Sequence, residues 1–283
     1  MLRVGWWLLL AYACTVATAN GWVALGLPYP GDIGSGLIFY GVLYAVVAYF
    51  VRRHSGEPWR ELIPLRGMAP RLSIPVLLGS LGTVVLSYEA VTFCIAINVL
   101  PKEALDVARG GGVAPSSVSA APSLFSAIMA TAVLPPLFEE ALMRGLVLQA
   151  LATVMSKRRA VVISALYFAV MHGAIERTPG TFLVGLLYGW LFVRTGSLIP
   201  GMLAHALHNG AILALDWTHT LPGQRGSPFL VDRYGLLPPW LVWVAVACLA
   251  AGVLLVPKTR LWPEDKGWKS PDEVEDESER LAA

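Results

Sequence analysis

Charged residues are scarce in this sequence, and so is cysteine. Only 14% of the 283 residues are Asp, Glu, Lys or Arg, whereas 56% are hydrophobic. Soluble domains carry about 25% charged residues, so this composition excludes an ordinary soluble protein. The three cysteines, Cys14, Cys94 and Cys248, have no C-x-x-C spacing and no neighbouring ligands. We interpret them as reduced packing residues.

Several catalytic signatures are also missing. The sequence has no H-E-x-x-H for zinc and no pair of aspartates at the centres of apolar runs. The Gly-x-Ser-Gly turn of serine intramembrane proteases is approached only at residues 33–36, where position 33 is Ile. We interpret that loop as the start of a helix. These absences argue against the usual zinc, aspartyl and serine mechanisms.

Long hydrophobic runs dominate what is present. A bilayer core about 30 Å thick needs about 20 apolar residues in a helix, and the mean hydropathy of +0.62 fits a membrane protein. The sequence predicts an all-α polytopic membrane protein with about eight transmembrane helices. The predicted spans are residues 4–27, 33–51, 72–99, 124–155, 160–174, 182–193, 198–215 and 236–256.

The distribution of Lys and Arg predicts the orientation of these spans. Most of the basic residues lie at 52–71, at 157–159 and after the last span. The positive-inside rule then places both termini in the cytoplasm, as in a multi-pass protein of a prokaryotic plasma membrane. The first run contains Ala17-Thr18-Ala19, which is similar to a signal-peptidase site, so a cleaved first span is an alternative.

Two adjacent carboxylates and an arginine stand inside the fourth run. Ionisable groups in a span mark a functional site by default. Glu140 and Arg144 are four residues apart and share a helix face, which predicts a charge-assisted pair. Glu139 lies about 100° round the helix, and we predict it to be the reactive group. The alternative is a structural ion cluster between helices.

Pro135 and Pro136 come just before these carboxylates. Proline interrupts the hydrogen bonding of a helix, so we expect a kink there. Backbone carbonyls released near the kink need other partners, which favours a polar pocket at this level.

Histidines stand in two later runs. Phe168 and His172 form an F-x-x-x-H pair, and His205 and Asn209 share a face four residues apart. His208 is rotated about 60° from His205, so we do not expect it in the same pocket. Each of these polar groups could instead be a packing residue or a hydrogen bond between helices.

A carboxylate, two histidines and an asparagine can activate water and stabilise an oxyanion. Glu139 would be the general base and one histidine would hold the same water. The other histidine and Asn209 would donate hydrogen bonds to the oxyanion. A different class of protein, a proton-coupled transporter, could use the carboxylate and the histidines as a proton relay.

These residues resemble the CAAX prenyl-endopeptidase and bacteriocin-processing (CPBP, Abi) family of intramembrane proteases. The family pattern is E-E-x-x-x-R, then F-x-x-x-H, then H-x-x-x-N/D, and residues 139–144, 168–172 and 205–209 match it without departure. The stretch LYGWLFVRTGSLIPGMLAHALHNG is also similar to bacterial members. The resemblance covers residues 123–215.

The resemblance implies hydrolysis of a peptide bond in or near the membrane. It implies catalytic roles for Glu139, His172, His205 and Asn209, and supporting roles for Glu140, Arg144 and Phe168. In this interpretation Glu139 and His172 activate water without a cofactor or metal. Another interpretation of the family makes the Glu and His residues zinc ligands, but asparagine is a poor zinc ligand.

The sequence also predicts a domain organisation, and the resemblance suggests partners. Residues 1–120 would form a three-helix membrane region with an external loop, residues 121–262 the catalytic membrane domain, and residues 263–283 a disordered acidic tail. The substrate would be a membrane-anchored or lipidated protein or peptide, such as a prenylated CAAX terminus, a leader peptide or a C-terminal sorting tail. No nucleic-acid partner is expected, and a regulatory scaffold without proteolysis is a further alternative.

Overall fold

The computed structural model describes the central part of the chain. The described residues are 59–103, 123–172, 174–218, 231–232 and 235–257, with the single positions Gly41, Ala45 and Tyr49. The first predicted span, nearly all of the second, the signal-peptide alternative and the acidic tail lie outside them. All secondary structure in the described part is helical, which confirms the all-α prediction there.

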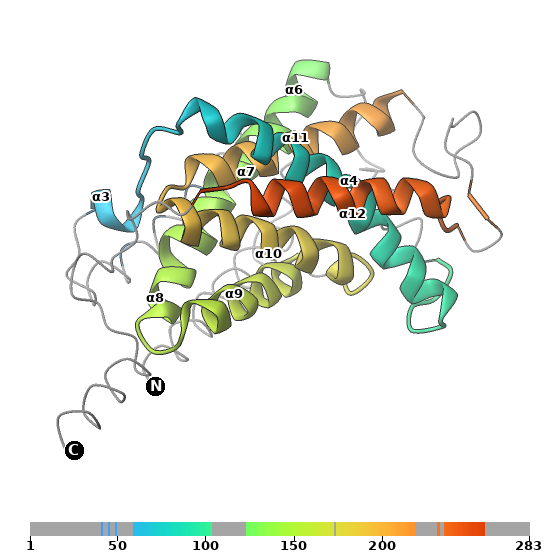
Figure 1. Ribbon diagram of the computed structural model, residues 1–283, viewed down its shortest axis with the longest axis horizontal. Coiled ribbons are helices and arrows are strands. Elements are labelled where there is room, and N and C mark those ends of the chain that lie inside the picture. Colours follow the sequence, from blue (N-terminus) through green and yellow to red (C-terminus); the bar gives the residue numbers. More distant parts are fainter. Residues whose placement is uncertain are drawn as a thin grey trace, which may run out of the picture.

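The helices follow the predicted apolar runs closely (Figure 1). They are α3 (Trp59–Leu62), the short 3-10 helix η1 (Pro70–Leu72), α4 (Ser73–Ala96), α9 (Lys157–Met171), α10 (Thr178–Thr195), α11 (Ile199–Trp217) and α12 (Pro239–Leu254). Between α4 and α9 lies one long helix with two π-helical stretches. Its parts are α6 (Leu124–Ile128), η3 (Met129–Val133), α7 (Leu134–Glu140), η4 (Ala141–Leu148) and α8 (Gln149–Ala152).

Two of these helices are long and apolar enough to cross a bilayer. They are Pro70–Ala96 and Leu124–Ala152, and α12 is apolar but shorter. The third and fourth predicted spans therefore have the length and composition of membrane helices. The total of eight spans and their orientation stay predictions.

Small residues let α4 and α12 pack closely. A side chain at Gly252 would come within 2.5 Å of the backbone nitrogen of Gly79, and one at Gly82 within 2.7 Å of the carbonyl of Ala245. Figure 1 shows α12 lying across α4, and α9 running beside α10. Close backbone approach through small residues is typical of helices that pack in membranes.

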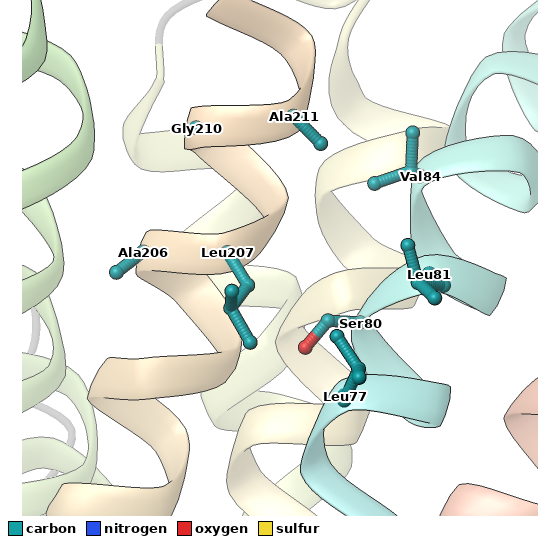
Figure 2. A pocket seen from close by; sticks show the side chains of 8 residues that line it. All are labelled: Leu77, Ser80, Leu81, Val84, Ala206, Leu207, Gly210 and Ala211. Atoms are coloured by element: carbon teal, nitrogen blue, oxygen red, sulfur yellow. The ribbon is translucent and has the colours of Figure 1, made fainter. Parts of the chain in front are cut away.

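A mostly apolar groove of about 310 Å³ lies between α4 and α11 (Figure 2). It is lined by Leu77, Ser80, Leu81, Val84, Ala206, Leu207, Gly210 and Ala211. Ala206 and Gly210 directly follow His205 and Asn209 in the chain, so the two polar side chains belong to a different face of α11. The groove is thus separate from the candidate site described below.

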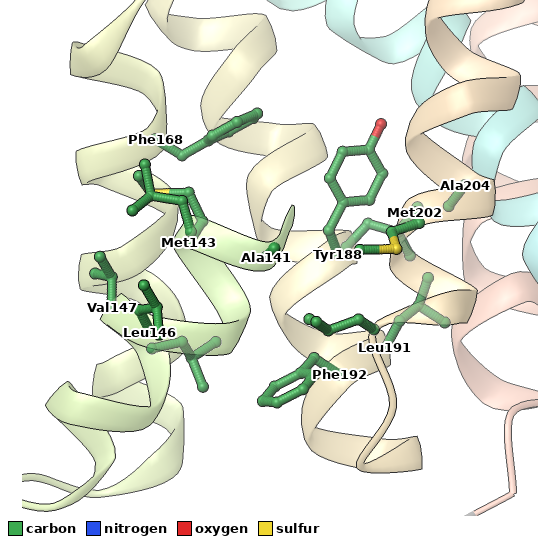
Figure 3. Packing of buried hydrophobic residues seen from close by; sticks show 14 of the residues in the cluster. Ala141, Met143, Leu146, Val147, Phe168, Tyr188, Leu191, Phe192, Met202 and Ala204 are labelled. Atoms are coloured by element: carbon green, nitrogen blue, oxygen red, sulfur yellow. The ribbon is translucent and has the colours of Figure 1, made fainter. Parts of the chain in front are cut away.

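The main core joins η4 to α9, α10 and α11 (Figure 3). Met143, Leu146 and Leu148 are fully buried, and Phe168 and Phe192 are nearly so. Because η4 begins immediately after Glu140, this core fixes the position of the carboxylates relative to the three later helices.

Candidate active site

Glu140 contacts two other residues of the site. Its Oε1 accepts a hydrogen bond of 2.9 Å from Nη1 of Arg144, and each of the two side chains is only 1% exposed. This confirms the predicted pairing of the two residues. The same oxygen lies 3.1 Å from Nδ1 of His205 on α11, a contact that the sequence did not predict.

Arg144 is surrounded by groups that compensate its charge. Its Nη2 donates to the carbonyl of Gly185 at 2.8 Å. The guanidinium carbon lies 4.7 Å from the ring centroid of Phe168 and 5.4 Å from that of Tyr188. A buried cation needs such a set of partners, because desolvation is expensive.

His205 faces both carboxylates. Its Nε2 lies 3.9 Å from Oε2 of Glu139, while its Nδ1 contacts Glu140. A carboxylate can only accept, so Nδ1–H is the donor toward Glu140. Nε2 is then an acceptor in the neutral ring and a donor in the doubly protonated ring. The protonation of His205 thus decides whether its Nε2 accepts or donates a hydrogen bond on the side of Glu139.

His172 directly follows α9 as its C-cap residue. Its Nδ1–H donates to the carbonyl of Phe168 at 2.8 Å, and the two rings meet edge-on at 4.9 Å. This bond leaves Nε2 as the ring nitrogen available for chemistry. The Phe168 ring also meets His205 edge-on at 5.8 Å, so both imidazoles pack around one aromatic ring.

Asn209 contacts the irregular helix before the prolines. Its Nδ2 donates to the carbonyl of Thr131 at 2.9 Å. In an α-helix this carbonyl would accept from residue 135, and in a π-helix from residue 136. Both are prolines without an N–H, so Thr131 needs an outside donor. The structure has the π-helical stretch Met129–Val133 just before the two prolines at which the sequence predicted a kink.

His208 belongs to a different contact. Its Nδ1 lies 3.3 Å from Oγ1 of Thr83 on α4, which agrees with the expectation that it lies outside the pocket of His205. The hydroxyl of Thr83 donates in turn to the carbonyl of Ser80, so the imidazole is the donor to Thr83.

Sequence reasoning missed two residues next to the site. Tyr188 of α10 stacks on His205 with ring centroids 5.0 Å apart and planes at 23°. Gly201 lies against Glu140, where an added Cβ would be 3.2 Å from Oε2. Both residues lie in the stretch 187–210 that is similar to bacterial members of the family, and Gly201 is also four residues before His205, but no motif singled them out.

No group of three or more His, Cys, Asp and Glu side chains is arranged to hold a metal ion within the described ranges. The Glu140 oxygen nearest His205 is already engaged by Arg144.

Comparison with known proteins supports the class of protein. Residues 121–211 match the family model for the type II CAAX prenyl endopeptidases called Rce1-like. This segment contains all three sequence motifs, and the predicted resemblance to CAAX proteases is therefore confirmed for it. No curated protein and no solved structure matches the chain.

Proposed function

We propose that this chain is an intramembrane endopeptidase that hydrolyses a peptide bond with a water activated by Glu139 and His172. One observation carries the proposal: the imidazole of His205 faces two consecutive buried carboxylates, at 3.1 Å and 3.9 Å. The match of residues 121–211 to the Rce1-like model supports the same class of reaction.

The proposed reaction begins at Glu139. The carboxylate takes a proton from the water while Nε2 of His172 accepts the water's other hydrogen bond. The water oxygen attacks the carbonyl carbon of the scissile peptide bond and forms a tetrahedral intermediate. Glu139 then returns the proton to the leaving nitrogen as the C–N bond breaks.

His205 and Asn209 would stabilise the oxyanion of that intermediate. With both ring nitrogens protonated, His205 donates from Nδ1 to Glu140 and from Nε2 to the oxyanion. The amide of Asn209 has two N–H groups, and one of them donates to Thr131. The second is the donor that we assign to the oxyanion. Arg144, Glu140 and Phe168 hold these groups in place.

We further propose a membrane-associated substrate, because the model that residues 121–211 match describes prenyl endopeptidases. A farnesylated C-terminal CAAX peptide is the first substrate to test. We place the protein in a cell membrane with both termini in the cytoplasm, and we assign no metal or cofactor to the reaction.

An internally quenched farnesylated CAAX peptide, with an unprenylated copy for comparison, tests the function on the purified protein. Glu139→Gln keeps the shape of the side chain but removes the base, so turnover should fall by about 10²–10⁴-fold with no loss of folding. Glu103 is exposed, and Glu103→Gln is the matched control that should cleave normally. Undiminished cleavage by Glu139→Gln would remove Glu139 from the mechanism. Proton-coupled solute flux in liposomes without any peptide product would favour the transporter instead.

A further inference from the structure

Tyr188 lies against the proposed catalytic groups, although the mechanism above does not use it. Its side chain is fully buried and its ring stacks on His205. In Figure 3 the hydroxyl points away from Leu191 and Phe192, which belong to the apolar core. The tyrosine therefore has an apolar end in the core and a polar end beside the site.

The hydroxyl of Tyr188 has no hydrogen-bond partner among the residues that the structure describes. Oε2 of Glu140 and Nε of Arg144 are also buried there without a hydrogen-bond partner. Phenylalanine would fill the same space without burying an unsatisfied hydroxyl, so the oxygen itself needs an explanation.

One internal water within reach of all three atoms would satisfy them. Buried waters typically make about three hydrogen bonds to polar groups that the protein leaves unsatisfied. Arg144 Nε donates, the Glu140 oxygen accepts, and the Tyr188 hydroxyl can do either. All three side chains are 99–100% buried. The guanidinium of Arg144 contacts both of the others, through its hydrogen bond to Glu140 and its position over the Tyr188 ring.

We propose that Tyr188 is a positioning residue for His205, and that its hydroxyl binds an internal water shared with Glu140 and Arg144. The ring fixes the plane of the imidazole, and the water fixes the carboxylate that accepts from Nδ1. Tyr188 thereby holds Nε2 of His205 in the direction that oxyanion stabilisation requires. This inference rests on the proposed function for its consequence in catalysis, but the water and the state of His205 can be measured without any substrate.

Two measurements on the protein without substrate test the contact itself. An experimental structure that resolves other internal waters should show one within hydrogen-bond distance of the Tyr188 hydroxyl and of Glu140 Oε2. In ¹⁵N NMR of labelled histidine, the His205 signals, assigned by their loss in His205→Gln, should move in Tyr188→Phe.

Tyr88 supplies the matched control. Its hydroxyl donates to the carbonyl of Gly235 at 3.1 Å, away from the site, so Tyr88→Phe should leave the His205 signals unchanged. A structure with no water at Tyr188, or unchanged His205 signals in Tyr188→Phe, would overturn the inference.

Kinetic measurements then test the effect of Tyr188 on catalysis. In Tyr188→Phe, kcat on the farnesylated CAAX peptide should fall by about 10- to 100-fold with little change in KM, and the pH profile of kcat should shift. Tyr88→Phe should keep the wild-type kcat and the wild-type pH profile. If the wild-type protein cleaves the peptide and Tyr188→Phe has the same kcat, the positioning role is refuted. If the wild type cleaves no peptide, the proposed function fails on that substrate, and the structural and NMR results still decide the role of Tyr188.

Discussion

The side-chain amide of Asn209 donates to the backbone carbonyl of Thr131, the oxygen that Pro135 and Pro136 leave without a helical partner. This contact joins α11 to the helix that carries both glutamates. Asn209 therefore has a structural role before any substrate binds, in addition to the oxyanion role that we propose for it.

Removing the amide should thus affect stability as well as catalysis. Asn209→Ala leaves a carbonyl unsatisfied, so we expect a loss of about 1–3 kcal/mol in the free energy of unfolding, with turnover reduced by about 10²–10³-fold. Pro135→Ala restores an N–H four residues after Thr131. The double variant should therefore recover stability in a thermal melt but not recover cleavage. Recovery of both would mean that Asn209 acts only through Thr131.

The Glu140–Arg144 pair should behave as one unit. Each single alanine variant strands a buried charge, which typically costs about 3–5 kcal/mol. The double variant should lose clearly less than the sum of the two, and a double-mutant cycle of melting temperatures in detergent measures this coupling. Additive losses would contradict the pairing at 2.9 Å. Glu140→Ala should also reduce turnover, because His205 loses its acceptor.

A side chain at Gly201 should disturb the same carboxylate. The added Cβ in Gly201→Ala would lie 3.2 Å from Glu140 Oε2, so the carboxylate must shift and its contact with His205 should weaken. We expect a decrease in kcat of about 10-fold or more, since small misplacements in an active site are costly. Gly67→Ala is the control, because nothing lies within 4 Å of its added Cβ. Equal activity of the two variants would show that the packing at Gly201 does not matter.

Chelation distinguishes metal-free activation of the water from zinc-dependent activation. If Glu139 and His172 activate water without metal, cleavage should survive prolonged dialysis against a chelator, and elemental analysis should find no stoichiometric zinc. Loss of activity that returns on adding zinc would instead make Glu139, His172 and His205 ligands.

Local contacts of the site were predictable from the sequence because they depend only on helix geometry. Residues four apart face each other on any α-helix, so the pairing of Glu140 with Arg144 follows from their spacing. The same reasoning separated His208 from His205, and the two prolines indicated that a carbonyl would need a partner. The three motifs were enough to suggest the class of protease.

The contacts between helices were decided only by the tertiary structure. The spacing of residues does not give the rotation of α11 about its axis, and that rotation sets His205 Nδ1 on Glu140 and Nε2 toward Glu139. It likewise brings Asn209 to Thr131. Tyr188 reads in the sequence as one more apolar residue of α10, and only packing against α11 places its ring on His205. Helical periodicity determines which residues share a face, whereas the depth and rotation at which two faces meet depend on the side chains that fill the space between them.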